Sequence, residues 1–264
     1  MAVSNGDQRG REKETVALEE AIAVGRERLT RTWPELLATG LVAGIDVSLG
    51  VLALLFVEQE TGSRMLGALA FSTGFIALIL GKTELFDENY LVPVAAVVAD
   101  RPGVGPLARL WIGMAASNLV GCWIFAGLTA AALSPLAPTA VKVATFYPER
   151  GVTWESFALG ALGGAVITLM TWMEHGSPTQ FGRIVAAILA GFILAGAPLN
   201  HVIVMSAEMF TALHMGAPFG YADWAGMAAW VAVTNMAGGL LLVTLLRLLQ
   251  VRAGQREGPV AGEE

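Results

Sequence analysis

The sequence predicts an all-α integral membrane protein in which six transmembrane helices form an inverted repeat of three plus three, with the second and fifth helices broken. The first observation is composition: 55% of the 264 residues are apolar and only 14% are charged, whereas soluble domains carry roughly 25% charged residues. The second is that long uncharged stretches recur along the chain. The third is that two of these stretches are interrupted by polar residues at matching places in the two halves.

This composition excludes several classes of protein. So few charges cannot cover a globular surface in water, which argues against an ordinary cytosolic enzyme and against a disordered regulator. The net charge of −6 argues against a nucleic-acid partner. The single cysteine, Cys122, excludes a disulfide framework and a cysteine-based metal site. We therefore expect neither a metal nor another cofactor.

The two ends of the chain are polar. Residues 1–33 lack the apolar run of a cleavable signal peptide and are expected to form a cytoplasmic segment. Within 12–33, one helical face collects apolar side chains, so an amphipathic helix here either lies on the membrane surface or packs on the protein. These side chains are Leu18, Ile22, Leu29 and Trp33. Residues 251–264 are expected to form a flexible cytoplasmic tail.

Residues 34–250 make up the predicted transmembrane domain. A helix needs about 20 residues to cross a hydrocarbon core of ~30 Å. The predicted spans, in order, are 34–57, 65–99, 106–133, 155–173, 182–214 and 223–249. The loop 134–154, which contains three prolines, is expected to lie outside the cell.

The second and fifth spans are the broken ones. In the second, four charges fall within seven residues: Lys82, Glu84, Asp87 and Glu88. In the fifth, Pro198 is followed by Asn200 and His201 before the apolar run resumes. Non-helical backbone at membrane depth is tolerated only where it is buried in protein or lines a water-filled cavity. Two such breaks in corresponding places therefore indicate a transport site.

The positive charges predict the orientation in the membrane. With the N-terminus inside, the inner segments carry twelve Lys or Arg residues and the outer loops carry three. This distribution predicts a multi-pass protein of the plasma (inner) membrane with both termini in the cytoplasm.

The two halves of the chain resemble each other in order. Gly40 to Gly44 recurs as Gly160 to Gly164, Glu84-Leu-Phe recurs as Glu208-Met-Phe, and Asn118-x-x-Gly recurs as Asn235-x-x-Gly, at offsets of 117 to 124 residues. Since each half holds three spans, an odd number, the second half must be inverted relative to the first.

These motifs resemble those of the formate/nitrite transporter family, over roughly residues 14–250. Gly81 to Asp87 is similar to the Gly-x-(Asp/Glu)-Leu-Phe-Thr signature of that family's broken second helix. Asn200-His201 with Met209-Phe210 resembles the signature of its broken fifth helix, and the two Asn-x-x-Gly motifs resemble those on its helices three and six. The resemblance implies a homopentamer of aquaporin-like protomers, each with its own pore for small monovalent anions or their acids. Two departures stand out: Asp87 replaces the family's Thr, and Asn200 replaces its acidic residue before the histidine.

The candidate pore residues gather at the two breaks. His201 can donate a proton or a hydrogen bond to an anion in a dry constriction, and the resemblance implies that Phe86 narrows the pore so that an ion must shed water. Lys82 either attracts anions or neutralises a neighbouring carboxylate. A bare carboxylate at Asp87 would repel anions, so Asp87 is protonated, paired with Lys82, or a sign of a different solute. Asn200 directly precedes His201.

Four further residues are candidates for supporting the breaks. Glu84 and Glu208, which match in the repeat, are expected to hold the two loops through backbone N–H groups. Asn118 and Asn235 either hold the freed backbone or offer an amide to the permeant. Asp46, in the first span, is either a proton relay or a buried partner.

The sequence thus predicts a channel or transporter, and not an enzyme, for small monovalent anions such as formate or nitrite, linked to protons through His201. One alternative is a pore for another small solute, neutral or a weak acid, given Asp87. A remote alternative is an intramembrane metalloenzyme built on four residues, although no His-Glu-x-x-His spacing is present. These four are His175, His201, Glu208 and His214.

Overall fold

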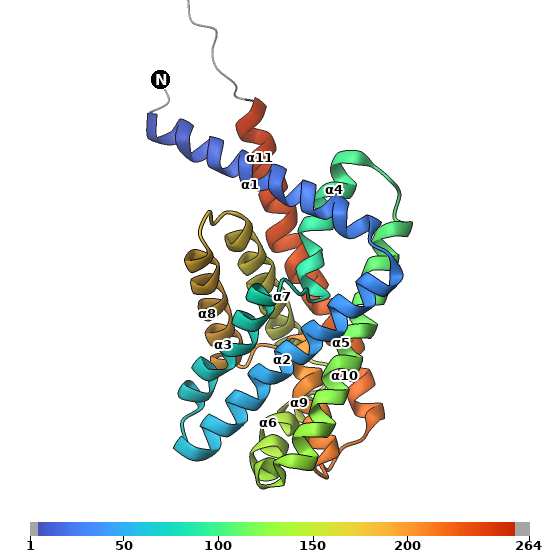
Figure 1. Cartoon of the computed structure of the whole chain (residues 1–264). Coiled ribbons are helices and arrows are strands. Elements are labelled where there is room, and N and C mark those ends of the chain that lie inside the picture. Colours follow the sequence, from blue (N-terminus) through green and yellow to red (C-terminus); the bar gives the residue numbers. More distant parts are fainter. Residues whose placement is uncertain (1–4, 257–264) are drawn as a thin grey trace, which may run out of the picture.

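The computed structural model describes residues 5–256, and side chains are described for Val16 and for residues 18–251. Helices and short connections account for this whole range (Figure 1). The helices are α1 (Asn5–Thr30), α2 (Trp33–Thr61), α3 (Arg64–Gly81), α4 (Val92–Asp100), α5 (Gly105–Ala132), α6 (Ala137–Arg150), α7 (Trp154–His175), α8 (Gln180–Gly196), α9 (Val202–His214), α10 (Tyr221–Ala237) and α11 (Leu245–Arg256). Two short 3-10 turns, η1 (Asp87–Tyr90) and η2 (Ser134–Leu136), and a π-helical segment, η3 (Gly238–Thr244), complete the chain.

In the part of the chain that the structure describes, five helical stretches are long and apolar enough to cross a membrane. They are α2, α3, α5, α7 and the continuous stretch 221–251 formed by α10, η3 and α11. The helices α8 and α9 are apolar but shorter, with 17 and 13 residues. These elements form a bundle with α1 across one end and α6 at the other, which we call the α1 end and the α6 end (Figure 1).

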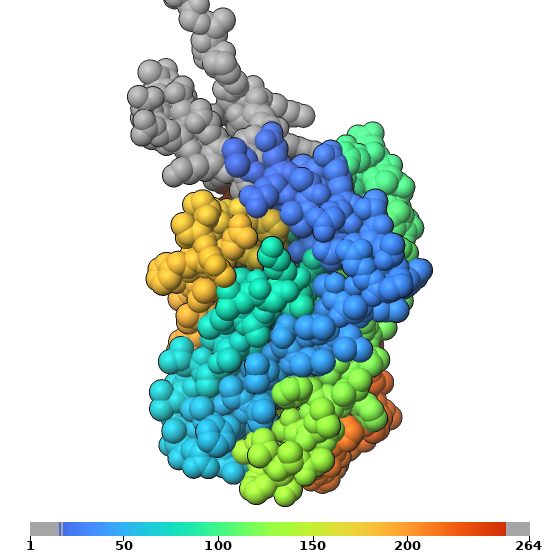
Figure 2. All heavy atoms as spheres, viewed as in Figure 1, coloured from blue at the N-terminus to red at the C-terminus, as the bar shows by residue number. Residues whose placement is uncertain are grey.

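The apolar face of α1 packs on the protein. Leu18 and Leu29 are buried, and Ile22 packs against the core. Figure 2 shows the described part of α1 lying directly on the end of the bundle. Of the two expected positions for this face, the structure therefore favours packing on the protein. Trp33 does not belong to the face, because it begins α2 and is exposed.

Two connections differ in secondary structure from what the sequence predicts. Residues 251–256, expected in a flexible tail, continue α11, whose Leu248 and Val251 pack with Leu18 and Trp172; residues 257–264 lie outside the described residues. The expected loop 134–154 is largely helical, since residues 137–150 form α6. Pro138 lies in the first turn of α6, where a missing N–H breaks no helical hydrogen bond.

Glycines let the helices approach backbone to backbone, and the same arrangement occurs twice. A Cβ at Gly44 of α2 would overlap the backbone of Asn118 in α5, and a Cβ at Gly164 of α7 would overlap the backbone of Asn235 in α10. Because the obstructing atoms are backbone atoms, no side-chain rotation can relieve the overlap. Small residues at such crossings are typical of helices packed in membranes.

We predict that Gly164→Ala destabilises the protein, because one added methyl group forces α7 away from α10. Overpacking of this kind costs about 1–3 kcal/mol, so the thermal unfolding temperature of the purified protein in detergent should fall by several degrees. Gly226→Ala is the matched control, since nothing lies within 4 Å of a Cβ at Gly226 in α10. Equal unfolding temperatures for the two variants would contradict this prediction.

Candidate functional site

Two non-helical segments lie at the centre of the site. The first runs from Lys82 to η1, between α3 and α4, and Lys82 ends α3 in the left-handed conformation with φ of 54°. The second runs from Ala197 to His201, between α8 and α9. Glu84 to Tyr90 and Leu199 to His201 are buried. We call these the first and second breaks.

The amide of Asn118, on α5, holds the first break. Its Oδ1 accepts a hydrogen bond from the N–H of Phe86 at 2.8 Å. Its Nδ2 donates to the carbonyl of Glu84 at 3.1 Å and to that of Gly40, on α2, at 2.8 Å. One buried side chain thus pairs two backbone groups of the first break and adds a hydrogen bond to a carbonyl of α2.

Asn235, on α10, does the same at the second break. Its Oδ1 accepts from the N–H of Val202 at 2.9 Å, and its Nδ2 donates to the carbonyls of Asn200 and Gly160, each at 2.8 Å. Because both asparagine amides are occupied by backbone groups, the geometry favours their bracing role over contact with a permeant.

The two breaks meet at Asp87 and His201. Asp87 Oδ2 lies 2.5 Å from His201 Nε2, and both side chains are fully buried at 0% exposure. His201 Nδ1 accepts a hydrogen bond from the N–H of Val204 at 3.2 Å. Only an unprotonated ring nitrogen can accept, so the ring proton lies on Nε2 and faces Asp87. Of the three alternatives for Asp87, the pairing with Lys82 is therefore wrong: Asp87 lies against His201 of the other break.

Phe86 packs in a group of three aromatic side chains beside this pair. Its ring meets that of Tyr90 edge-on at 5.2 Å, and Tyr90 meets Trp111 at 5.8 Å. The indole N–H of Trp111 donates to the carbonyl of Asn89 at 2.9 Å, which ties α5 to η1. Phe86, which precedes Asp87 in the chain, is thus held in place by its aromatic neighbours.

The two matched glutamates do not hold the breaks as expected. Glu84 Oε1 lies 3.1 Å from Arg28 Nε and 2.8 Å from Arg31 Nη1, so α1 and the residue after it are fastened to the first break. Glu208 accepts a hydrogen bond from the hydroxyl of Tyr147, on α6. Among the described residues neither carboxylate accepts from a backbone N–H, because these long side chains reach cations or a hydroxyl on other elements.

Sequence reasoning missed these three partners. From the sequence alone, Arg28 and Arg31 contribute only to the positive charge that predicts the orientation in the membrane. Tyr147 carried no local signal, since its segment was expected to be a loop. A buried carboxylate needs a partner, and the cationic N-terminal segment was the one sequence signal that could have indicated where to look for it.

Three other predicted residues lie near the breaks. Lys82 is exposed and forms no ion pair with another described residue, so its expected pairing with Glu84 or Glu88 is wrong. Asn200 donates to the carbonyl of Ser156 at 3.2 Å. Asp46 accepts a hydrogen bond from Thr83 at 2.6 Å, which favours the buried-partner alternative.

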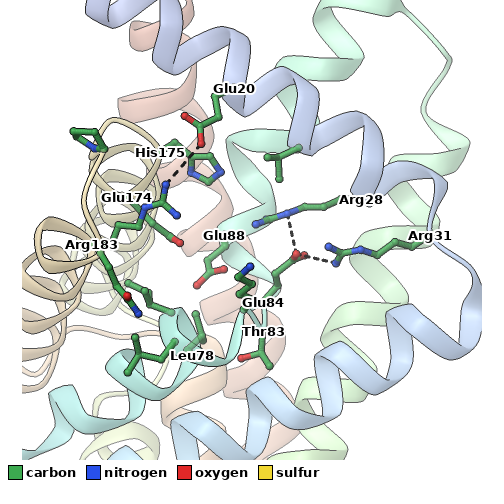
Figure 3. Close-up of a pocket in the computed structure, with 16 residues that line it drawn as sticks. Glu20, Arg28, Arg31, Leu78, Thr83, Glu84, Glu88, Glu174, His175 and Arg183 are labelled. Atoms are coloured by element: carbon green, nitrogen blue, oxygen red, sulfur yellow. Dashed lines mark ion pairs between the residues drawn. The ribbon is translucent and has the colours of Figure 1, made fainter.

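A cavity of about 480 Å³ opens beneath α1 and reaches the first break (Figure 3). Its wall comes from α1, the end of α3, the first break, the end of α7 and the start of α8. Both cations and carboxylates line it. They are Glu20, Arg28, Arg31, Lys82, Glu84, Glu88, Glu174 and Arg183, and His175 lies among them. Neither Asp87 nor His201 forms part of this wall.

The family model described as "Formate/nitrite transporter" matches residues 14–249. The chain belongs to the formate/nitrite transporter family. Among curated relatives, inner membrane protein YfdC of Escherichia coli (strain K12) is 27% identical over 249 residues, covering 86% of this chain and 76% of that protein. Formate channel FocA of the same strain is 22% identical over 221 residues, covering 79% and 75%. Formate channel BtFdhC of Bacillus thuringiensis is 24% identical over 238 residues, covering 84% and 88%.

Solved structures show that the fold is also that of this family. A structure titled "FNT family ion channel" matches with a TM-score of 0.80 and 15% identity, covering 89% of this chain and 99% of that one. A structure titled "Pentameric formate channel with formate bound" matches with a TM-score of 0.61 and 18% identity, covering 85% and 95%. A formate/nitrite transporter family member with these apolar helices is an integral membrane protein.

Members of the formate/nitrite transporter family are channels or transporters, and the metalloenzyme alternative finds no site here. The four residues it needs have separate surroundings: His201 faces Asp87, Glu208 faces Tyr147, His175 contacts the carbonyl of Thr171, and His214 packs on Trp123. No group of three or more His, Cys, Asp or Glu suited to a metal ion occurs among the side chains that the structure describes.

We predict that Asn235→Ala strongly destabilises this family member, because two buried backbone groups at the second break lose their partner. Each buried unpaired group costs about 1–3 kcal/mol. Thermal unfolding in detergent should show a large loss, and Asn118→Ala should show a similar one. Ser48→Ala is the control, since its hydroxyl donates to the carbonyl of Gly44 within the same helix. An Asn235→Ala variant as stable as Ser48→Ala would show that the asparagine is not a brace.

Proposed function

We propose that this protein is a proton-linked channel or transporter for small monovalent anions, with formate or nitrite as the substrate. The family membership supports a channel, and the names of FocA and BtFdhC as formate channels support formate. The formate-bound pentameric neighbour supports a homopentamer in the lipid bilayer. The name of the relative YfdC supports the inner membrane, and the positive charges support cytoplasmic termini.

We further propose that residues 34–250 form an inverted repeat of three plus three helices around two broken helices, in an aquaporin-like protomer. The matched contacts of Asn118 and Asn235 support the repeat, as do the matched glycine crossings at Gly44 and Gly164. In this arrangement residues 1–33 form the cytoplasmic N-terminal segment. The α1 end of the bundle is then the cytoplasmic end.

The observation that carries the proposed mechanism is the buried contact between His201 and Asp87. The Nε2–H of His201 is a hydrogen-bond donor in a dry place where the two breaks meet. An anion in the pore would accept this hydrogen bond, and α9 begins at Val202 beside it, so its positive dipole end favours negative charge. In this proposal Phe86 narrows the pore, Lys82 attracts anions to the cavity, and Asn200 with the two bracing asparagines shapes the constriction.

Asp87 supports a second candidate, a pore for a neutral solute or a weak acid. Its carboxylate lies 2.5 Å from His201 Nε2, where an anion would bind. Formate is itself a carboxylate. A charged Asp87 therefore competes with formate for the Nε2–H of His201 and repels the formate anion. Passage as the neutral acid, with one proton for each anion, avoids this repulsion.

We predict that His201→Ala leaves a folded oligomer with greatly reduced transport. A hydrogen bond to a charged group is worth about 1.5–3 kcal/mol, so formate and nitrite uptake into liposomes should fall by about tenfold or more. The measurement is stopped-flow uptake at acid and neutral pH, with oligomer size checked by native mass spectrometry. Unchanged uptake at both pH values would dispose of a role for His201.

We predict that Asp87→Thr keeps anion uptake at low pH and raises it at high pH. A carboxylate at position 87 can carry a negative charge that repels anions, whereas threonine cannot ionise. A rise of about tenfold would correspond to ~1.4 kcal/mol of removed repulsion. The same liposome assay, run over a range of pH, is the test. An unchanged pH dependence would show that Asp87 does not gate the pore and only joins the two breaks.

A further inference from the structure

Glu88 is a buried carboxylate that reaches the cavity beneath α1. It lies in η1, directly after Asp87, and only 2% of it is exposed. Figure 3 shows its carboxylate lying in the cavity, between the ends of α1 and α7. The mechanism proposed above for anion passage does not use this residue.

Among the side chains that the structure describes, no cation forms an ion pair with Glu88, although cations are close. The guanidinium of Arg28 contacts Glu84 through Nε and donates to Asn89 through Nη1. Arg31 also pairs with Glu84. Lys82 forms no ion pair with a described residue, and Glu88 Oε1 has no hydrogen-bond partner among the described residues. Glu84 thus pairs with two arginines through Oε1, whereas Glu88 forms no ion pair with a described residue.

The other charged or titratable groups around Glu88 come from each element that surrounds the cavity. Glu20 and Arg28 face the cavity from α1, Lys82 and Glu84 from the first break, Glu174 and His175 from α7, and Arg183 from α8. Arg183 lies 3.8 Å from Glu20, so this cation is engaged as well. The carboxylate of Glu174 adds negative charge on the side opposite the break.

The pair formed by Asp87 and His201 is sealed from this cavity. Both side chains have no exposed surface, and neither lines the cavity wall. A proton that moves between the cavity and this pair must therefore pass through another group. Glu88 is the side chain that combines a place on the cavity wall, a place next to Asp87 in the chain, and an unpaired carboxylate oxygen.

We propose that Glu88 relays protons between the cavity and the pair formed by Asp87 and His201. A hydronium ion in the cavity gives its proton to the carboxylate of Glu88, which becomes a carboxylic acid and leaves a water molecule. Glu88 then passes this proton to Asp87 and returns to the carboxylate. From Asp87 the proton joins the anion held at His201, and the neutral acid moves on. This inference rests on the proposed proton-linked function and names its proton route.

A purely structural role fits Glu88 poorly. A buried charge without a partner is costly, and an amide of the same size would remove that cost. If Glu88 served packing alone, Glu88→Gln would be as good as the natural residue or better. A relay, in contrast, needs a group that both takes up and releases a proton, which glutamine cannot do.

The test measures formate uptake and proton uptake together in liposomes that contain a pH-sensitive dye. With Glu88→Gln we expect proton uptake at neutral pH to fall by about tenfold or more and to lose its dependence on external pH. Glu88→Asp should restore both, since it keeps a carboxylate. Glu60→Gln removes an exposed carboxylate outside the cavity wall, so it is the control and should behave as the natural protein.

The outcomes separate the two proposals. If the natural protein takes up neither formate nor nitrite, the proposed function is wrong. If it takes up formate with protons and Glu88→Gln does so at the same rate and pH dependence, the relay is wrong while the function stands. Should Glu88→Gln fail to fold, a carbodiimide, which reacts with protonated carboxyl groups, is applied to the natural protein. The relay requires that Glu88 is labelled and that labelling blocks proton uptake; labelling of Glu174 instead of Glu88 would overturn it.

Discussion

Backbone groups that a helix leaves unpaired must find partners inside the protein at membrane depth, because lipid offers none. The rest of this structure follows from how the two breaks meet this requirement. Asn118 and Asn235 each pair two backbone groups at a break and contact one carbonyl of a neighbouring helix. Their amides reach those groups only because glycines such as Gly44 and Gly164 let the neighbouring helices come close. Asp87 in the first break and His201 in the second are thereby held in place.

The places of the breaks and of the two asparagines could be predicted from the sequence, because interrupted apolar runs and Asn-x-x-Gly motifs are local patterns. The partners of the charged residues could not. Lys82 is five residues from Asp87, yet Asp87 pairs with His201, far along the chain. Glu84 likewise pairs with Arg28 and Arg31 from outside the break. Such pairings depend on how the two halves pack together, and sequence spacing does not contain that information.

The carboxylate of Asp87 thus lies at the place where the two breaks meet. In our account the carboxylate of Asp87 takes the place of an anion on His201, which disfavours free passage of anions. The neighbouring Glu88 opens to the cavity and supplies the proton that turns an anion into a neutral acid. In this account Asp87 disfavours the anion, so the neutral acid passes, and Glu88 supplies the proton that makes the neutral acid. The ion pairs of Glu84 with Arg28 and Arg31 keep the cavity wall in position around them.

The central claim is that the substrate and a proton cross together through the place where the two breaks meet. The most direct measurement is the ratio of protons to formate taken up by liposomes containing the natural protein, recorded with the membrane potential. Our account predicts one proton for each formate and no net current, over the whole pH range in which uptake occurs. A current carried by formate without proton uptake would contradict it.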